Sequence, residues 1–185
     1  MIGADFAGVL AAAQEGNDRA FSRLWRDGNP ALLRYLRITA PGAADDVASE
    51  TWLQVVAGLA GFSGGEGAFR AWLFTIARHR AVDAGRSRSR RSDVPLAVTD
   101  EVTGQPMAPD AAELALEAIS TRSVVALIKT LPREHAEIIM LRVVAGLEAA
   151  DVARIVGKTP GAVRVTAHRA LRRLAELAER AGVTR

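Results

Sequence analysis

Cysteine is absent from the 185-residue chain, and so is any long apolar run. Without cysteine the chain has no disulfide scaffold, no thiolate zinc site and no cysteine nucleophile. No apolar run reaches the roughly 18 residues that a membrane-spanning helix needs, and the chain does not open with a signal peptide. We therefore expect a cytoplasmic protein with no membrane insertion.

The patterns typical of an enzyme are also missing. The three histidines, His79, His135 and His168, lie in separate segments, and no pair has the spacing of metal ligands. The glycines of FSGGEG, residues 62–67, do not follow the order of a phosphate-binding loop. The sequence shows no recognisable pairing of a catalytic nucleophile with a general base. We expect no catalytic site, no metal site and no cofactor.

No segment alternates polar and apolar residues as a half-buried strand would. Hydrophobic residues make up 49% of the chain and charged residues 24%, which is typical of a globular protein. The charge is unevenly distributed. Residues 1–91 hold twelve Lys and Arg against nine Asp and Glu, and residues 113–185 hold twelve against eight. Between them, residues 92–112 hold four acids, three prolines and no basic residue.

We therefore predict an all-α protein of two small helical domains, residues 1–91 and 113–185. A flexible, acidic, proline-rich linker at 92–112 joins them. Two basic blocks on either side of an acidic connector suggest two sites for a polyanion.

Residues 147–174 read as two short helices joined by a tight turn, and this predicts a helix-turn-helix. Apolar residues at 147, 152, 155 and 156 repeat at helical spacing. Gly157 ends this helix, because glycine enters the left-handed conformation at low cost. Thr159 is a good N-cap, and Pro160 suits the first helical position, where its missing N–H costs nothing.

The second of these helices has two unlike faces. The inner face is apolar and carries Val163, Ala167, Ala170 and Leu174. The outer face is small and basic and carries Gly161, Val165, His168 and Arg172, flanked by Arg164 and Arg169. Such a helix suits the major groove of DNA. The alternative is an ordinary helical hairpin whose basic side faces solvent.

The first domain begins with helical apolar stripes over residues 5–36, which restart at Asn29-Pro30. Residues 43–59 form another helix. Its apolar stripe consists of Val47, Thr51, Val55 and Leu59, with Trp52 and Val56 beside it. A second, polar face consists of Asp46, Glu50 and Gln54. This face is either the solvated side of the helix or an acidic stripe that docks onto a basic partner.

A strong helix follows at 69–85, and the basic run RSRSRR comes directly after it at 86–91. Several side chains fall partly or wholly outside its buried stripe: Arg70, Phe74, Arg78, His79 and Asp83. Arginines that hold phosphates and an aromatic ring that stacks an unpaired base fit nucleic-acid binding. By itself, the basic run is equally compatible with a solvated tail. In the second domain we expect a further helix over residues 134–145, which Gly146 ends.

These motifs, taken in order, resemble a bacterial RNA polymerase sigma factor of the sigma-70 superfamily, and most closely the short two-domain extracytoplasmic-function group. EGNDRAFSRLW at 15–25 is similar to the start of the first conserved domain. AADDVASETWLQVVAGL at 43–59 resembles the helix that grips the polymerase. FRAWLFTIARHRAVDAGRSRSRR at 69–91 resembles the segment that opens and reads the −10 element. Residues 131–174 resemble the domain that reads the −35 element.

The resemblance implies three sets of contact residues. Contacts with core polymerase, through its beta-prime and beta subunits, fall to Asp46, Ser49, Glu50, Trp52 and Gln54. Contacts with −10 DNA fall to Phe62, Arg70, Phe74, Arg78, His79, Arg80, Asp83, Arg86 and Arg88. Contacts with −35 DNA fall to Thr159, Gly161, Arg164, Val165, His168, Arg169 and Arg172.

Four positions depart from the family pattern. Ser49 stands where glutamine is usual, and His79 stands where asparagine commonly lines the pocket for a flipped −10 base. Val165 and Thr166 stand where the family often has serine and arginine. A valine can touch a thymine methyl group but forms no hydrogen bond, so the −35 sequence does not follow by analogy.

The leading hypothesis is a promoter-specificity subunit of RNA polymerase that reads −10 and −35 elements and has no catalysis of its own. The resemblance also implies an anti-sigma partner that covers the polymerase-binding surfaces. The alternative is a stand-alone helix-turn-helix regulator that does not load onto polymerase. That alternative leaves the polar face of residues 43–59 and the helix at 69–91 unexplained.

Overall fold

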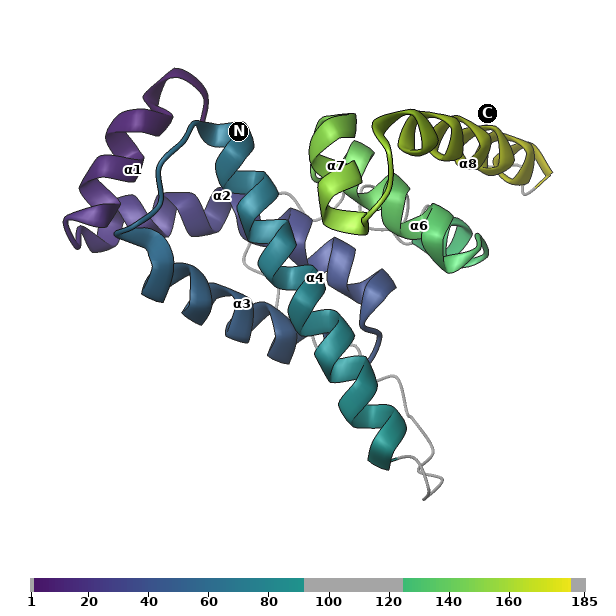
Figure 1. Ribbon diagram of the computed structural model, residues 1–185, viewed down its shortest axis with the longest axis horizontal. Helices are drawn as coiled ribbons and strands as arrows, with labels where there is room; N and C mark the ends of the chain where they lie inside the picture. The colour runs from purple at the N-terminus through teal and green to yellow at the C-terminus, as the bar shows by residue number, and fades with distance from the viewer. Residues whose placement is uncertain (1, 92–124, 181–185) are drawn as a thin grey trace, which may run out of the picture.

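The computed structural model describes residues 2–91 and 125–180, and every regular element in these ranges is helical. The first range holds η1 (Gly3–Asp5), α1 (Phe6–Gln14), α2 (Asp18–Thr39), α3 (Ala44–Leu59) and α4 (Glu66–Arg91). The second holds helical residues 125–129, α6 (Arg133–Ile139), η2 (Met140–Val144), α7 (Ala149–Val156) and α8 (Pro160–Arg180), as Figure 1 shows. The predicted all-α fold is confirmed. The predicted linker at 92–112 lies outside the described residues.

The first domain is built where α2 crosses α3 and α4. Leu32, Val55 and Leu73, one from each helix, are fully buried at this crossing. Gly28 of α2 permits a close approach, because a Cβ there would lie 3.1 Å from a Leu73 methyl carbon and 3.3 Å from the Trp52 ring. The predicted apolar stripe of α3 points into this core, since its four members at 47, 51, 55 and 59 are all buried.

Helix α2 runs without a break from Asp18 to Thr39 with Pro30 in its interior, so the predicted restart at Asn29-Pro30 is wrong. Proline lacks the N–H that would bond to the carbonyl one turn earlier, and this loss normally kinks or ends a helix. Here tertiary contacts hold the residues directly before the proline. The Trp52 indole N–H donates to the Asn29 side-chain oxygen at 3.0 Å, and Gly28 packs against the same ring.

Helix α4 extends from Glu66 through the basic run to Arg91, so the predicted end at Gly85 is also wrong. An interior glycine costs a helix only about 1 kcal/mol relative to alanine, and packing can offset that cost. The Arg88 guanidinium ties the extension to the first domain by donating to the carbonyl of Pro41, just beyond the end of α2.

In the second domain the predicted single helix at 134–145 is two elements. Helix α6 ends at Ile139, and one π-helical turn, η2, continues the winding. The Ala145 N–H donates to the carbonyl of Met140, five residues earlier, at 2.9 Å. Gly146 then takes a positive φ of 66°, and the Leu147 N–H closes the turn on the Leu141 carbonyl at 3.0 Å. Leu141 and Leu147 are buried together in the domain core.

The predicted helix-turn-helix is confirmed. Gly157 ends α7 in the left-handed conformation, with φ of 70° and ψ of 41°. The Thr159 hydroxyl accepts a hydrogen bond from the Ala162 N–H at 3.2 Å, and α8 begins at Pro160. Val163 and Ala170 of α8 are fully buried against the rest of the domain.

The two domains pack against each other. Helix α2 lies against η2 and α6, and α4 lies against α7 (Figure 1). Helices α3 and α8 lie on opposite sides of the molecule in Figure 1. In the described part of the chain, no helix is both long and apolar enough to cross a bilayer.

The turn between α7 and α8 can be tested with two glycines. A Cβ at Gly157 or at Gly161 meets no atom within 4 Å, but only Gly157 has a positive φ. We expect Gly157→Ala to lower the free energy of unfolding by about 1–2 kcal/mol, because a Cβ disfavours the left-handed conformation. Gly161→Ala, inside a helix, should raise it by about 0.5–1 kcal/mol. Urea unfolding followed by circular dichroism measures both. Equal changes in the free energy of unfolding for the two substitutions would show that the positive φ of Gly157 is not what requires glycine in this turn.

Candidate functional site

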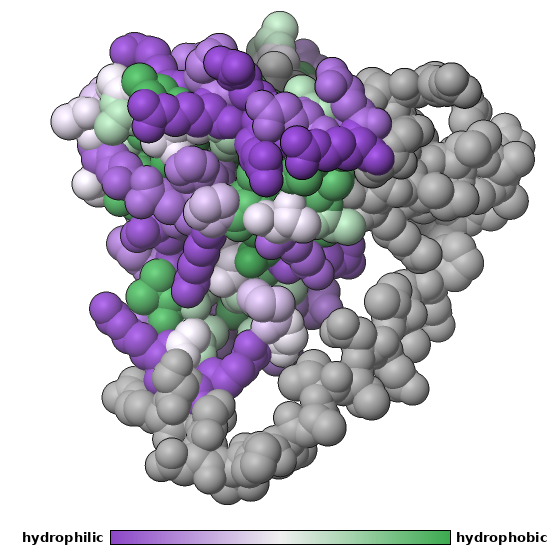
Figure 2. All heavy atoms as spheres, turned by 90° about the vertical axis from the view of Figure 1, so that its right-hand side faces the viewer, coloured by the Kyte–Doolittle hydropathy of each residue, from purple (hydrophilic) through white to green (hydrophobic). Residues whose placement is uncertain are grey.

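Helix α8 presents the outer face that the sequence predicts for DNA. Six side chains or backbone positions on it are exposed: Gly161, Arg164, Val165, His168, Arg169 and Arg172. Among the described residues, Arg164, Arg169 and Arg172 form no ion pair. The surface on this side of the molecule is largely hydrophilic, with small hydrophobic patches (Figure 2). Thr159 precedes this face and caps the helix, so its hydroxyl is partly occupied by the Ala162 N–H.

The outer face of α3 combines acidic and apolar groups. Asp46, Ser49 and Glu50 are exposed, as predicted for a face open to a partner. Leu53 and Val56 are 71% and 54% exposed, so the placement of Val56 beside the buried stripe is wrong. Exposed apolar side chains rimmed by charges are typical of protein-binding surfaces. The sequence analysis missed Leu53, although it stands three and four residues after Glu50 and Ser49, on the same face of the helix, and it did not predict the exposure of Val56.

The other two residues predicted on α3 have partners within the first domain. Trp52 is buried, donates to Asn29, and meets the Phe21 ring edge-on with ring centres 6.0 Å apart. Gln54 is exposed, and its side-chain oxygen accepts two hydrogen bonds from the Arg80 guanidinium, at 3.0 and 2.8 Å. Trp52 therefore sets the position of α3, and Gln54 links α3 to α4.

The glycine-rich loop before α4 is held in place from both sides. The Gln14 amide donates to the carbonyls of Leu59 and Phe62 at 2.9 and 2.7 Å. The half-buried Phe62 ring stacks on Trp72, with ring centres 5.0 Å apart and planes at 21°. This fixed loop sets the start of α4, which carries the predicted −10 residues.

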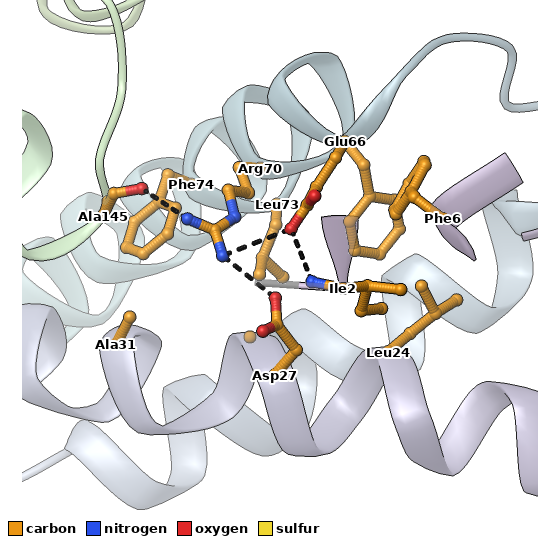
Figure 3. Close-up of a pocket in the computed structure, with 12 residues that line it drawn as sticks. Ile2, Phe6, Leu24, Asp27, Ala31, Glu66, Arg70, Leu73, Phe74 and Ala145 are labelled. Atoms are coloured by element: carbon orange, nitrogen blue, oxygen red, sulfur yellow. Dashed lines mark hydrogen bonds and ion pairs between the residues drawn. The ribbon is translucent and has the colours of Figure 1, made fainter. Parts of the chain in front are cut away.

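Arg70 lies in a network of charges between the domains (Figure 3). Its guanidinium contacts Asp27 at 3.0 Å and Glu66 at 3.5 Å, and donates to the carbonyl of Ala145 in the second domain at 3.5 Å. Glu66 in turn accepts from the backbone N–H groups of residues 2 and 3. Burial raises the pKa of the Asp27 carboxyl, but hydrogen bonds, including the one from Arg70, outweigh this, and the net pKa lies below its usual value.

Phe74 and Arg78, one turn apart on α4, face the second domain. Phe74 is 1% exposed and meets Tyr35 of α2 edge-on, with ring centres 5.4 Å apart. The Arg78 Nε donates to Oε1 of Glu137, on α6, at 2.9 Å. The Tyr35 hydroxyl donates to the same oxygen at 3.0 Å. The prediction that Phe74 lies partly or wholly outside the buried stripe of α4 is therefore wrong. Arg78, which is predicted to contact −10 DNA, faces Glu137 in the described arrangement.

The remaining predicted −10 residues lie along the far part of α4. His79, Asp83, Arg86 and Arg88 are exposed, and Asp83 lies 3.9 Å from Arg86. A cleft of about 830 Å³ opens between α2, α4 and α6. Its lining consists of Tyr35, Thr39, Arg78, Ala81, Val82, Gly85, Arg86, Arg133 and Glu137. In residues 2–91 and 125–180, no group of three or more His, Asp or Glu is placed to hold a metal ion.

Each of the two domains matches the sequence profile of a known protein family. Residues 20–91 match the sequence profile of Sigma-70 region 2, and residues 121–174 match that of Sigma-70, region 4. The chain is 36% identical over 180 residues to the ECF RNA polymerase sigma factor SigD of Mycobacterium tuberculosis, covering 94% of this chain and 84% of SigD. It is 34% identical over 181 residues to the ECF RNA polymerase sigma factor ShbA of Streptomyces griseus, covering 92% and 94%.

A solved structure is similar over most of the chain. It is the sigma factor RpoE from Bartonella quintana in complex with the anti-sigma factor NepR. The TM-score is 0.64 at 25% sequence identity, covering 86% of this chain and 96% of RpoE.

Tyr35 is the only tyrosine in the chain and therefore reports on the contact with Glu137. Burial, and then the Glu137 charge and hydrogen bond, raise the pKa of its phenol well above the ordinary value of about 10. Because the folded state holds the phenol in its neutral form, the contribution of Tyr35 to the free energy of unfolding is fully present below pH 10. That contribution is lost as the pH rises above 10 through the raised pKa of the folded state.

In an alkaline titration followed by tyrosinate absorbance, we expect the native chain to ionise well above the urea-unfolded chain. Glu137→Gln should lower the midpoint only part of the way, because burial is the larger cause. A native midpoint near pH 10 would contradict the described contact.

Proposed function

The chain belongs to the extracytoplasmic-function group of the sigma-70 family of RNA polymerase sigma factors, and we propose that it directs core polymerase to promoters through separate surfaces on its two domains. In this role it binds core polymerase, reads −10 and −35 elements, and catalyses no reaction itself. It works in the cytoplasm, where polymerase and promoter DNA are found. Membership of the family supports this role over that of a stand-alone helix-turn-helix regulator.

The outer face of α3 is the proposed surface for core polymerase. Its exposed acids, Asp46 and Glu50, surround Leu53, which is 71% exposed. Acidic groups attract a basic partner and set the orientation of the complex, and a central apolar side chain supplies area that is buried on docking. Trp52 supports this face from beneath, through its hydrogen bond to Asn29, and Ser49 lies on the face itself. The proposed partner is the beta-prime subunit.

The outer face of α8 is the proposed surface for duplex −35 DNA, and it is the observation that carries the proposal. Arg164, Arg169 and Arg172 are exposed and without ion pairs in the described chain, on a helix whose other face is buried. Val165 lies among them at 50% exposure and can contact a thymine methyl group. The buried face fixes the helix, so the exposed face can enter a groove as a rigid unit.

Helix α4 and the loop before it are the proposed surface for −10 DNA. The loop at 62–67 is fixed at the start of the helix, as a pocket for an extruded base requires. Further along, His79, Arg86 and Arg88 are exposed toward solvent and are proposed to follow the strand. Arg70, Phe74 and Arg78 belong to the same surface by the family pattern.

An anti-sigma factor is a further proposed partner. The similar RpoE of Bartonella quintana forms a complex with the anti-sigma factor NepR. In this chain the exposed acidic and apolar face of α3 offers such an inhibitor a surface that polymerase also needs.

The separation of the two surfaces gives a direct test. We expect Glu50→Lys to reduce binding to core polymerase by at least tenfold, because it places a positive charge in an acidic docking face. Arg164→Ala should leave core binding unchanged and weaken use of the −35 element, by roughly tenfold for one lost base contact. Co-purification with core polymerase and run-off transcription measure the two effects. Loss of core binding in Arg164→Ala would show that the surfaces are wrongly assigned.

A further inference from the structure

Helix α2 carries a stripe of arginines on its outer side. Its five members are all exposed: Arg19, Arg23, Arg26, Arg34 and Arg37. At about 100° per residue they fall within about 80° of one another around the helix axis. The stripe covers the 19 residues 19–37, or about 28 Å of helix at 1.5 Å per residue. None of these arginines belongs to the proposed surfaces on α3, α4 and α8.

The arginine stripe faces away from the helix crossing at the centre of the first domain. Gly28 marks the inner side of α2, since a Cβ there would meet Leu73 of α4 and Trp52 of α3. Gly28 lies about 160° around the helix from the middle of the stripe. The fully buried Leu32 and Tyr35 lie on the same side as Gly28. The stripe therefore points away from α3 and α4, toward the outside of the domain.

Within the described residues the charges of the stripe are almost unpaired. Only Arg23 forms an ion pair there, with the exposed Asp5 at 3.0 Å. Asp27 lies at the edge of the stripe, but its carboxylate is paired with Arg70 at 3.0 Å. Neighbouring like charges one turn apart disfavour a helix, and residues 19 and 23, 23 and 26, and 34 and 37 are such pairs. An anionic partner would relieve this repulsion.

The stability of α2 does not account for the arrangement. Arg37 lies in the last turn, where a cation complements the helix dipole, but Arg19 lies in the first turn, where a cation opposes it. Arg26 and Arg34 lie in the middle of the helix, and neither has an acid three or four residues away. In the described part of the chain, the charges of these two arginines are therefore available to an external partner.

The chemistry of the stripe fits a phosphate backbone. Its length of about 28 Å corresponds to about eight nucleotide steps of a duplex at 3.4 Å each, so it can follow a strand past several phosphates. Pro30 is the only other residue of 19–37 that falls within the same sector of the helix. The stripe thus offers no aromatic ring for stacking a base, and its contacts would fall on phosphates.

The stripe also leads to the basic end of α4. Arg37 lies one turn before Pro41, whose carbonyl accepts a hydrogen bond from Arg88 of α4. The proposed function places Arg88 on −10 DNA. A strand that follows α4 to Arg88 therefore reaches the end of α2 at which the stripe terminates.

We propose that the arginine stripe of α2 holds the phosphate backbone of promoter DNA in the polymerase complex, beside the −10 element and without reading its sequence. This proposal rests on the proposed function, because it adds a DNA contact to the same complex. The acidic face of α3 remains the surface for core polymerase, so the two helices serve partners of opposite charge.

Salt dependence of promoter binding by the holoenzyme tests the stripe. Each phosphate contact contributes about 0.9 to the slope of log K against log salt, so Arg26→Gln with Arg34→Gln should reduce the slope by about 1.8. Over a fourfold rise in salt, the variant should then lose roughly tenfold less affinity than the unsubstituted holoenzyme. The reduction should be the same on promoters with different −10 sequences, because phosphate contacts carry no sequence information. Core binding should not change.

Three further variants separate position from total charge and from folding. Arg26→Lys with Arg34→Lys keeps both charges and should keep the slope, because lysine also binds phosphate. Lys129→Gln with Arg180→Gln removes the same charge from exposed positions outside the three proposed surfaces and should not change the slope. Arg34→Gln alone is a milder change and should reduce the slope by about 0.9. Circular dichroism should show the same melting temperature for each variant as for the unsubstituted chain.

An unchanged slope in the double glutamine variant of the stripe would mean that the arginines are only solvated and would overturn the proposal. An equal reduction in Lys129→Gln with Arg180→Gln would overturn it too, because total charge would then set the slope. Loss of core binding in the stripe variant would also overturn it, since the partner would then be an acidic surface of polymerase. A holoenzyme that does not form with the unsubstituted chain would count against the proposed function instead.

Discussion

The close crossing of α2 with α3 and α4 is the constraint on which the rest of the first domain depends. A Cβ at Gly28 would lie only 3.1 Å from a Leu73 methyl carbon and 3.3 Å from the Trp52 ring, so glycine permits the close approach there. Beside it, Trp52 donates a hydrogen bond to Asn29. Because the crossing fixes the orientation of all three helices, each helix turns side chains of a different chemical type outward. Helix α3 shows acids and Leu53, α2 shows arginines on its outer side, and α4 shows its aromatic and basic groups toward the second domain.

Much of this could be read from the sequence because the controlling signals are local. Helical periodicity found the buried stripe of α3 and the inner face of α8, and the Gly157, Thr159 and Pro160 signals located the turn between α7 and α8. The errors arose where tertiary contacts override local preference. Trp52 supports α2 around Pro30, and no local signal marks the π-turn η2. The contact of Glu137 with Tyr35, 102 residues earlier, could not be found from spacing in the chain.

The arrangement of the two domains leaves two of the proposed surfaces open and covers part of a third. The acidic face of α3 and the basic face of α8 are open in the described structure, whereas the middle of α4 is covered by the second domain. The interface between the domains includes the Arg78–Glu137 ion pair and the hydrogen bond from Arg70 to the Ala145 carbonyl.

The central claim is that one chain joins a polymerase-docking surface to two DNA-reading surfaces and so selects where transcription starts. Run-off transcription with purified core polymerase on a pool of promoter templates, with and without the chain, tests this most directly. The account predicts new start sites that appear only when the chain is added and that require two conserved sequence blocks upstream of each start. Start sites that the chain never alters on any template would contradict the account.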